Sequence, residues 1–107
     1  MIGILGLVLL LTVTPVELAV TPQTGMAPLA VRLTMTVEPN ALNRKLCVDW
    51  DSERVSGSHC ESMDGADFPR TTHKALALSA GSYTFHATIY RVDNTTVFSK
   101  LVTVDVV

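Results

Sequence analysis

Basic residues are few and scattered along this chain. Lysine and arginine together number 8 against 10 aspartates and glutamates, so the formal net charge is -2, and the first basic residue is Arg32. No run of lysine or arginine is present that could follow a phosphate backbone. The composition therefore argues against nucleic acid as a partner.

Cysteine is also scarce, since Cys47 and Cys60 are the only two in the sequence. They form no Cys-x-x-Cys pair, and no histidine stands at zinc-ligand spacing. The segment between them can hold the end of one strand, a turn and a return strand, and Cys47 falls at an outward position of its strand. We therefore predict a Cys47–Cys60 disulfide, which indicates an oxidising, extracellular or surface-exposed location.

Catalytic motifs are also missing. The sequence has no Gly-x-Ser-x-Gly elbow and no glycine-rich phosphate loop. Three histidines, His59, His73 and His86, lack a repeated ligand spacing, so exposed histidines are the favoured interpretation. We expect a protein that is not an enzyme and that carries no cofactor.

Acidic residues gather between positions 49 and 67, where oxygen ligands for calcium could come from two loops. A solvated acidic edge is the favoured interpretation, because the EF-hand pattern is absent. The alternative is a calcium site whose candidate ligands are Asp49, Asp51, Asp64 and Asp67.

The chain begins with an apolar run, Met1 to Val13, that is too hydrophobic for an ordinary exposed terminus. A secretory signal lacks its basic n-region here, and a membrane span is interrupted by Pro15 and Glu17. A retained arm that docks into a partner protein is the third interpretation. We divide the chain into residues 1–15, an anchor, signal or docking arm, and residues 16–107, one domain with a real core.

Alternation of apolar and polar residues marks the strands of this domain. The clearest examples are Leu29 to Val37 and the stretch from Gly81 to Tyr90; shorter candidates are Val16–Pro22, Leu46–Asp51, Thr71–Leu78 and Phe98–Val107. The residue types of Gln23–Pro28 predict a turn. Those of Ser52–Arg70 predict either a long loop or one or two short edge strands.

Three aromatic residues are the expected core anchors. Tyr83 follows Gly81 by two residues at the entry to a late strand, which matches the tyrosine corner of Ig-like sandwiches. Phe85 alternates with polar residues on the same strand, and Trp50 is the expected centre of the core. We predict an all-β, Ig-like, antiparallel two-sheet sandwich of about seven strands.

Three segments together resemble the PKD domain, an Ig-like family of extracellular and surface proteins. They are Pro22-Gln23-Thr24-Gly25-Met26-Ala27-Pro28-Leu29-Ala30-Val31, Val48-Asp49-Trp50-Asp51 and Ala80-Gly81-Ser82-Tyr83-Thr84-Phe85. The order and spacing of the segments carry the match, which covers about residues 16–107. The resemblance implies adhesion or carbohydrate contact. One departure is the stretch Ser52-Glu53-Arg54, where the family continues with an aromatic residue and Gly-Asp-Gly.

Asn94-Thr95-Thr96 is a formal N-glycosylation sequon at a predicted hairpin tip. Its use requires a eukaryotic secretory route that nothing else in the sequence indicates, so coincidence is the favoured interpretation.

These observations leave three functions open. The first is a non-enzymatic interaction or decoration module on a cell envelope or virion, held by its apolar N-terminus through a protein or membrane contact. The second is a structural subunit whose N-terminal arm is buried in a neighbouring protein of an assembly such as a capsid. The third, an accessory binding domain of a secreted hydrolase, is disfavoured by the initiating Met1 and the lack of a linker.

Overall fold

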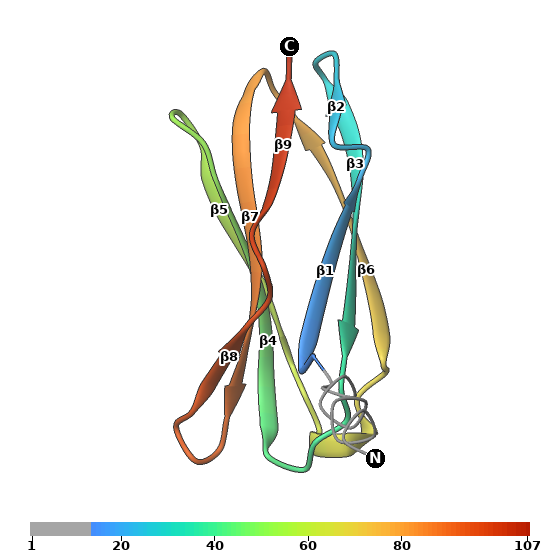
Figure 1. The fold of residues 1–107 in the computed structure, drawn as a ribbon, viewed down its shortest axis with the longest axis vertical. Helices are drawn as coiled ribbons and strands as arrows, with labels where there is room; N and C mark the ends of the chain where they lie inside the picture. Colours follow the sequence, from blue (N-terminus) through green and yellow to red (C-terminus); the bar gives the residue numbers. More distant parts are fainter. Residues whose placement is uncertain (1–13) are drawn as a thin grey trace, which may run out of the picture.

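A computed structural model describes residues 14–107, which form two packed β-sheets (Figure 1). Predictions about Met1–Val13 lie outside the described residues. The elements are β1 (Val16–Thr21), β2 (Thr24–Gly25), β3 (Leu29–Val37), β4 (Asn43–Asp51), β5 (Ser56–Ser62), η1 (Gly65–Asp67), β6 (Thr71–Leu78), β7 (Gly81–Arg91), β8 (Thr96–Phe98) and β9 (Val102–Val106). One sheet has the order β1-β3-β6 and the other β2-β9-β7-β4-β5, with β8 also paired to β7. The predicted Ig-like sandwich is confirmed.

Strict alternation of apolar and polar residues explains why β3 has the bounds that the sequence predicts, and β6 has its predicted bounds as the strand paired with β3. In β3 the side chains of Val31, Leu33, Met35 and Val37 are buried and the residues between them are not. β6 pairs with β3 along its whole length, from Leu29 opposite Leu78 to Thr36 opposite Thr71. A period of two places one face of each strand against the opposite sheet.

The core is centred on β7. Phe85 is fully buried, and its neighbours on the flanking strands are Trp50 of β4 and Val102 of β9. Its ring centroid lies 6.1 Å from that of Trp50 and 6.3 Å from that of Tyr83. Tilted aromatic pairs at this separation add to the free energy gained from burying their area.

The tyrosine corner predicted at the start of β7 is present. Tyr83 is 2% exposed, and its hydroxyl donates to the backbone carbonyl of Ser79 at 3.0 Å. Gly81, which opens the strand, has a φ of 151°, a conformation that side-chain-bearing residues rarely adopt. The Tyr83 hydroxyl therefore holds the β6–β7 turn against β7, and the buried ring of Tyr83 fixes β7 in the core.

Replacing Tyr83 with Phe should remove this hydrogen bond while keeping the ring in place. We expect the free energy of unfolding to fall by about 1 kcal/mol, measured by urea denaturation. Tyr90→Phe is the matched control, because Tyr90 lies on the same strand but is 38% exposed. Equal losses in the two variants would contradict the role of the corner.

Trp50 is not the centre of the core, which corrects the sequence prediction. It is partly buried near the end of β4, whereas Phe85 is fully buried. Its partner across the ladder is Gly57 of the edge strand β5, and a Cβ at Gly57 would clash with the indole ring. The ring therefore covers a glycine at the rim of the sandwich.

The turn predicted at Gln23–Pro28 contains a short strand instead. Thr24 and Gly25 form β2, which pairs in parallel with β9. The chain thus crosses from the edge of one sheet to the edge of the other after β1, so the sandwich is not purely antiparallel. Two residues are too few for a periodic pattern to reveal.

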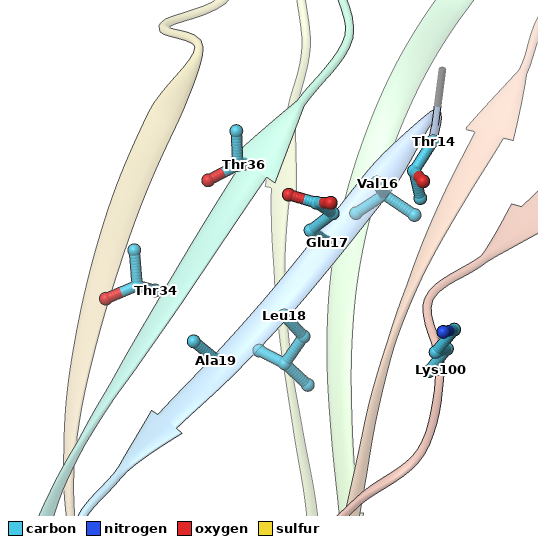
Figure 2. A pocket seen from close by; sticks show the side chains of 8 residues that line it. All are labelled: Thr14, Val16, Glu17, Leu18, Ala19, Thr34, Thr36 and Lys100. Atoms are coloured by element: carbon cyan, nitrogen blue, oxygen red, sulfur yellow. The ribbon is translucent and has the colours of Figure 1, made fainter. Parts of the chain in front are cut away.

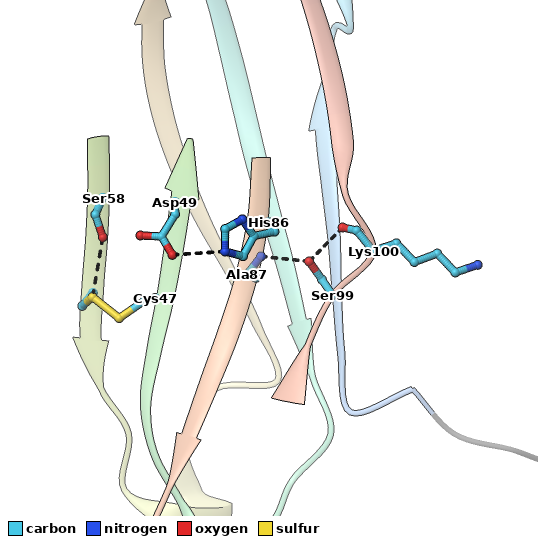
Figure 3. Close-up of polar contacts among 8 residues, drawn as sticks. Cys47, Asp49, Ser58, His86, Ala87, Ser99 and Lys100 are labelled. Atoms are coloured by element: carbon cyan, nitrogen blue, oxygen red, sulfur yellow. Dashed lines mark hydrogen bonds and ion pairs between the residues drawn. A yellow bond between two sulfur atoms is a disulfide. The ribbon is translucent and has the colours of Figure 1, made fainter. Parts of the chain in front are cut away.

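The closing strand predicted from Phe98 to Val107 is interrupted. Phe98 lies opposite Thr88 and Val102 opposite Phe85, so three residues on one strand face two on the other. Ser99 stabilises this bulge: its backbone N–H donates to the Ala87 carbonyl, and its hydroxyl accepts from the Ala87 N–H (Figure 3). The extra residue reverses the alternation, so Phe98 points outward while Val102, Val104 and Val106 face inward.

Candidate functional site

The outer face of the larger sheet carries the disulfide. Cys47 of β4 and Cys60 of β5 lie directly opposite each other, with Cα atoms 4.0 Å apart and a bond between their sulfurs. The predicted disulfide is confirmed, and it indicates an oxidising environment. Cys47 points away from the core, as predicted, but is only 3% exposed because its neighbours cover it.

Three side chains beside the disulfide form a strip on β7 and β8, which we call the aromatic strip: His86, Tyr90 and Phe98. Phe98 is 62% exposed, and its ring centroid lies 6.4 Å from that of His86. Tyr90 is four positions after His86 on β7, and the Lys45 ammonium lies 4.7 Å from its ring centre. Thr88, between Cys47 and Phe98, is only 2% exposed, so the middle of the strip is shielded from water.

Polar groups border this strip on the β4 side. His86 Nε2 lies 3.5 Å from Asp49 Oδ2, and both side chains are about one-third exposed (Figure 3). An exposed pair of this kind contributes little to stability. Flat apolar rings flanked by hydrogen-bonding and charged groups are the arrangement expected of a binding surface.

A groove runs beside β1 and is the second candidate surface (Figure 2). It has a volume of about 340 Å³. Val16, Leu18 and Ala19 supply its apolar lining, with Thr14 at the start of the described chain and Lys100 from the β8–β9 bulge on the opposite side. The groove therefore begins where the apolar N-terminal run joins the sandwich.

The structure does not bring the four calcium candidates together. Asp64 directly precedes η1 and Asp67 is its last residue. This turn lies beside Arg44 at the start of β4, since the Met63 N–H donates to the Arg44 carbonyl at 2.8 Å. Asp49 and Asp51 are further along β4, by about 16 to 23 Å at the usual rise of a strand. No group of three His, Cys, Asp or Glu side chains within residues 14–107 could hold a metal ion.

The histidines are also apart. His86 is in the aromatic strip, His59 lies 3.9 Å from Glu61 on the edge strand β5, and the His73 ring lies 3.1 Å from the Thr34 hydroxyl on the smaller sheet.

In the described part of the chain no helix is long and apolar enough to cross a bilayer.

Asn94 lies at the tip of the β7–β8 hairpin and is exposed, with a φ of 68°. The preceding Asp93 fixes the turn, because its carboxylate accepts from the Thr95 hydroxyl at 2.6 Å and from the Thr95 N–H at 3.1 Å. These hydrogen bonds lower the pKa of Asp93. The sequon thus stands on an accessible turn, and its glycosylation stays a prediction.

No protein-family model and no curated protein sequence matches this chain. Among solved structures it is similar to a chain titled "Myokine structure", with a TM-score of 0.53 and 12% sequence identity. That match covers 86% of this chain and 94% of the other. At this identity the similarity shows the fold alone.

Sequence reasoning missed both surfaces. The predicted closing strand Phe98–Val107 directs Val102, Val104 and Val106 inward, and unbroken alternation would direct Phe98 inward as well; the bulge turns it outward. The groove depends on how far apart the edges of two sheets lie, which no local pattern encodes. The available signal for the strip was the alternation of His86, Thr88 and Tyr90 on β7, whose outward face the sequence did identify.

Proposed function

We propose that this protein is a non-enzymatic interaction module, displayed on a cell envelope or virion surface and held there by Met1–Val13. The observation that carries the proposal is the place of Thr14. β1 begins at one end of the sandwich, while the β4–β5 and β6–β7 turns and the C-terminus lie at the other end (Figure 1). If the chain is attached through the residues before Thr14, the opposite end of the sandwich, with these two turns and the C-terminus, points away from the attachment point.

The aromatic strip is the surface that such a module would offer to a partner. Exposed aromatic side chains cost free energy in water and recur at the centres of interfaces, where a partner covers them. Either a protein or a carbohydrate presents groups that can pack on Phe98 and Tyr90 while hydrogen-bonding His86 or Asp49. Adhesion or carbohydrate contact is also what the PKD resemblance implies.

The apolar run supplies enough burial energy to hold the module. Each large apolar side chain that leaves water contributes about 1.5 to 3 kcal/mol, and Met1–Val13 contains several of them. The alternative, a subunit whose arm is buried in a neighbouring protein, uses the same energy.

Deleting Met1–Val13 should abolish attachment and leave a folded domain. We expect full-length protein to float with phosphatidylcholine–phosphatidylglycerol vesicles or to elute as an assembly in light-scattering chromatography. A chain of residues 14–107 should remain monomeric and unbound, with an unchanged circular dichroism spectrum. Attachment of the shortened chain as strong as that of the intact one would overturn the proposal.

A second pair of variants keeps the test decisive if the shortened chain folds poorly. In the full-length protein, Leu9→Asp should weaken attachment, because a buried charge is costly, whereas the matched control Leu9→Ile should not. Equal attachment by both variants would also overturn the proposal.

A further inference from the structure

β1 is an edge strand whose outward backbone groups lack a partner among residues 14–107. Among the strands of residues 14–107, β1 pairs with β3 alone. The Glu38 N–H donates to the Pro15 carbonyl at 2.9 Å, so Pro15 points its backbone groups toward β3. Since direction alternates along an antiparallel strand, the N–H and C=O groups of Val16, Leu18 and Val20 point away from β3. They form a row that can accept another strand.

The other sheet edges carry features that discourage strand addition. On β5 the residues on the core-facing side include His59 and Glu61, opposite Val48 and Leu46. On β6 the core-facing side includes Lys74, opposite Leu33. Charges directed inward at an edge, and a bulge such as that between β8 and β9, are known means of blocking edge-to-edge pairing.

β1 has none of these protections along its core-facing side. Val16 and Val20 are buried there, Leu18 is partly buried, and the strand has no bulge in its pairing with β3. Its one charged residue, Glu17, points to the outer face. The groove of about 340 Å³ lies along this same edge, and Thr14 lines it (Figure 2). β1 is therefore the edge best suited to accept a strand.

The chain itself contains a segment suited to this edge. Leu7–Val13 has no charge, glycine or proline and is rich in apolar residues, and it is long enough to pair with all six residues of β1. Such a segment can form a strand with one face directed toward the core. Main-chain hydrogen bonds to β1 would hold it, and its side chains would fill the apolar part of the groove.

A chain cannot easily supply this strand to its own β1. The segment would have to reverse direction between Leu11 and Pro15, where the residues are Thr12, Val13 and Thr14. Tight hairpin turns need residues that tolerate positive φ, such as glycine, asparagine or aspartate, and β-branched residues resist them. The strand donor is thus better placed on a second copy, whose arm extends past its own β1.

We infer that the free edge of β1 is the acceptor for the Leu7–Val13 strand of a second copy of this chain. This inference rests on the proposed function, in that Met1–Val13 is the attachment. The inference specifies the surface to which the N-terminal arm attaches, namely the β1 edge of a second copy of the domain. Two copies can exchange arms, or a series of copies can each pass an arm to the next.

Cross-linking between two differently tagged full-length copies tests the inference. One copy carries Ala19→Cys, an exposed position on the outer face of β1. The other carries a single cysteine at one of positions 7 to 11. The copies are mixed, treated with a short bismaleimide, and analysed for a heterodimer on a gel; the native cysteines are disulfide-bonded and do not react.

A strand added to β1 points alternate side chains to the outer face. We therefore expect heterodimer with either the odd-numbered or the even-numbered arm positions, and its loss with the other set. The matched control Ala75→Cys, exposed on the opposite edge strand β6, should give no heterodimer with any arm position. Equal yields at all positions, a spacing of three or four residues, or no heterodimer would overturn the inference.

The outcomes separate the two proposals. If the arm is required for attachment but gives no alternating cross-links, the inference fails and the proposed function stands. If the shortened chain attaches as well as the intact one, the proposed attachment through Met1–Val13 fails, whatever the pattern of cross-links.

Discussion

Replacing Phe85 with Ala should lower the free energy of unfolding by about 3 to 5 kcal/mol, the range for deleting a fully buried phenylalanine. The side chain is 0% exposed and lies between Trp50 and Val102 at the middle of the larger sheet. Its removal leaves a cavity between two sheets that cannot collapse without shifting their backbones. Urea denaturation of the two proteins measures the difference.

Trp50→Ala is the informative comparison for this prediction. The indole is larger than a phenyl ring, but it is only partly buried and its inward neighbour on β5 is Gly57. We therefore expect a smaller loss than for Phe85→Ala. A larger loss for Trp50→Ala would show that the core is centred on β4 and not on β7.

Removing the disulfide with the double substitution Cys47→Ala and Cys60→Ala should cost about 3 kcal/mol. The bond closes a loop with a sequence separation of 13, which restricts the unfolded chain. For a domain of this size the melting temperature should fall by about 10 to 20 °C. Differential scanning calorimetry measures the shift.

The wild-type protein with its disulfide reduced and alkylated is compared in the same experiment. A double variant that melts at the same temperature as the oxidised wild type would contradict the prediction. The folded-state contacts make this outcome unexpected, because Cys47 is buried between β5 and Thr88 and its loss also removes packing.

The two surfaces suggest different tasks for one small domain. The aromatic strip lies on the outer face of the larger sheet, and the acceptor edge β1 belongs to the smaller one. Attachment through β1 and the N-terminal arm would thus leave Phe98 and Tyr90 accessible to a partner. An assembly built by arm exchange would present the strip once per copy.

The sequence by itself determined the fold class, most strand positions and the disulfide. β3 and β7 each have a nearly unbroken alternation of apolar and polar residues, and this local pattern depends only on one face meeting a core. The tyrosine corner at Tyr83 could be predicted, because Gly81 and the strand that follows fix the position of Tyr83 relative to the turn. Cys47 and Cys60 could pair only with each other.

Only the tertiary structure decided the rest. Whether Trp50 or Phe85 is more deeply buried depends on which strands lie at the sheet edge, and strand order is not a local property. The bulge at Ser99 reverses the faces of the closing strand through hydrogen bonds to Ala87, a residue of another strand. The pairing of β2 with β9 and the edge position of β1 likewise depend on how the two sheets are placed against each other. Local alternation records which residues face inward, but contacts between distant strands determine which edges and side chains stay open.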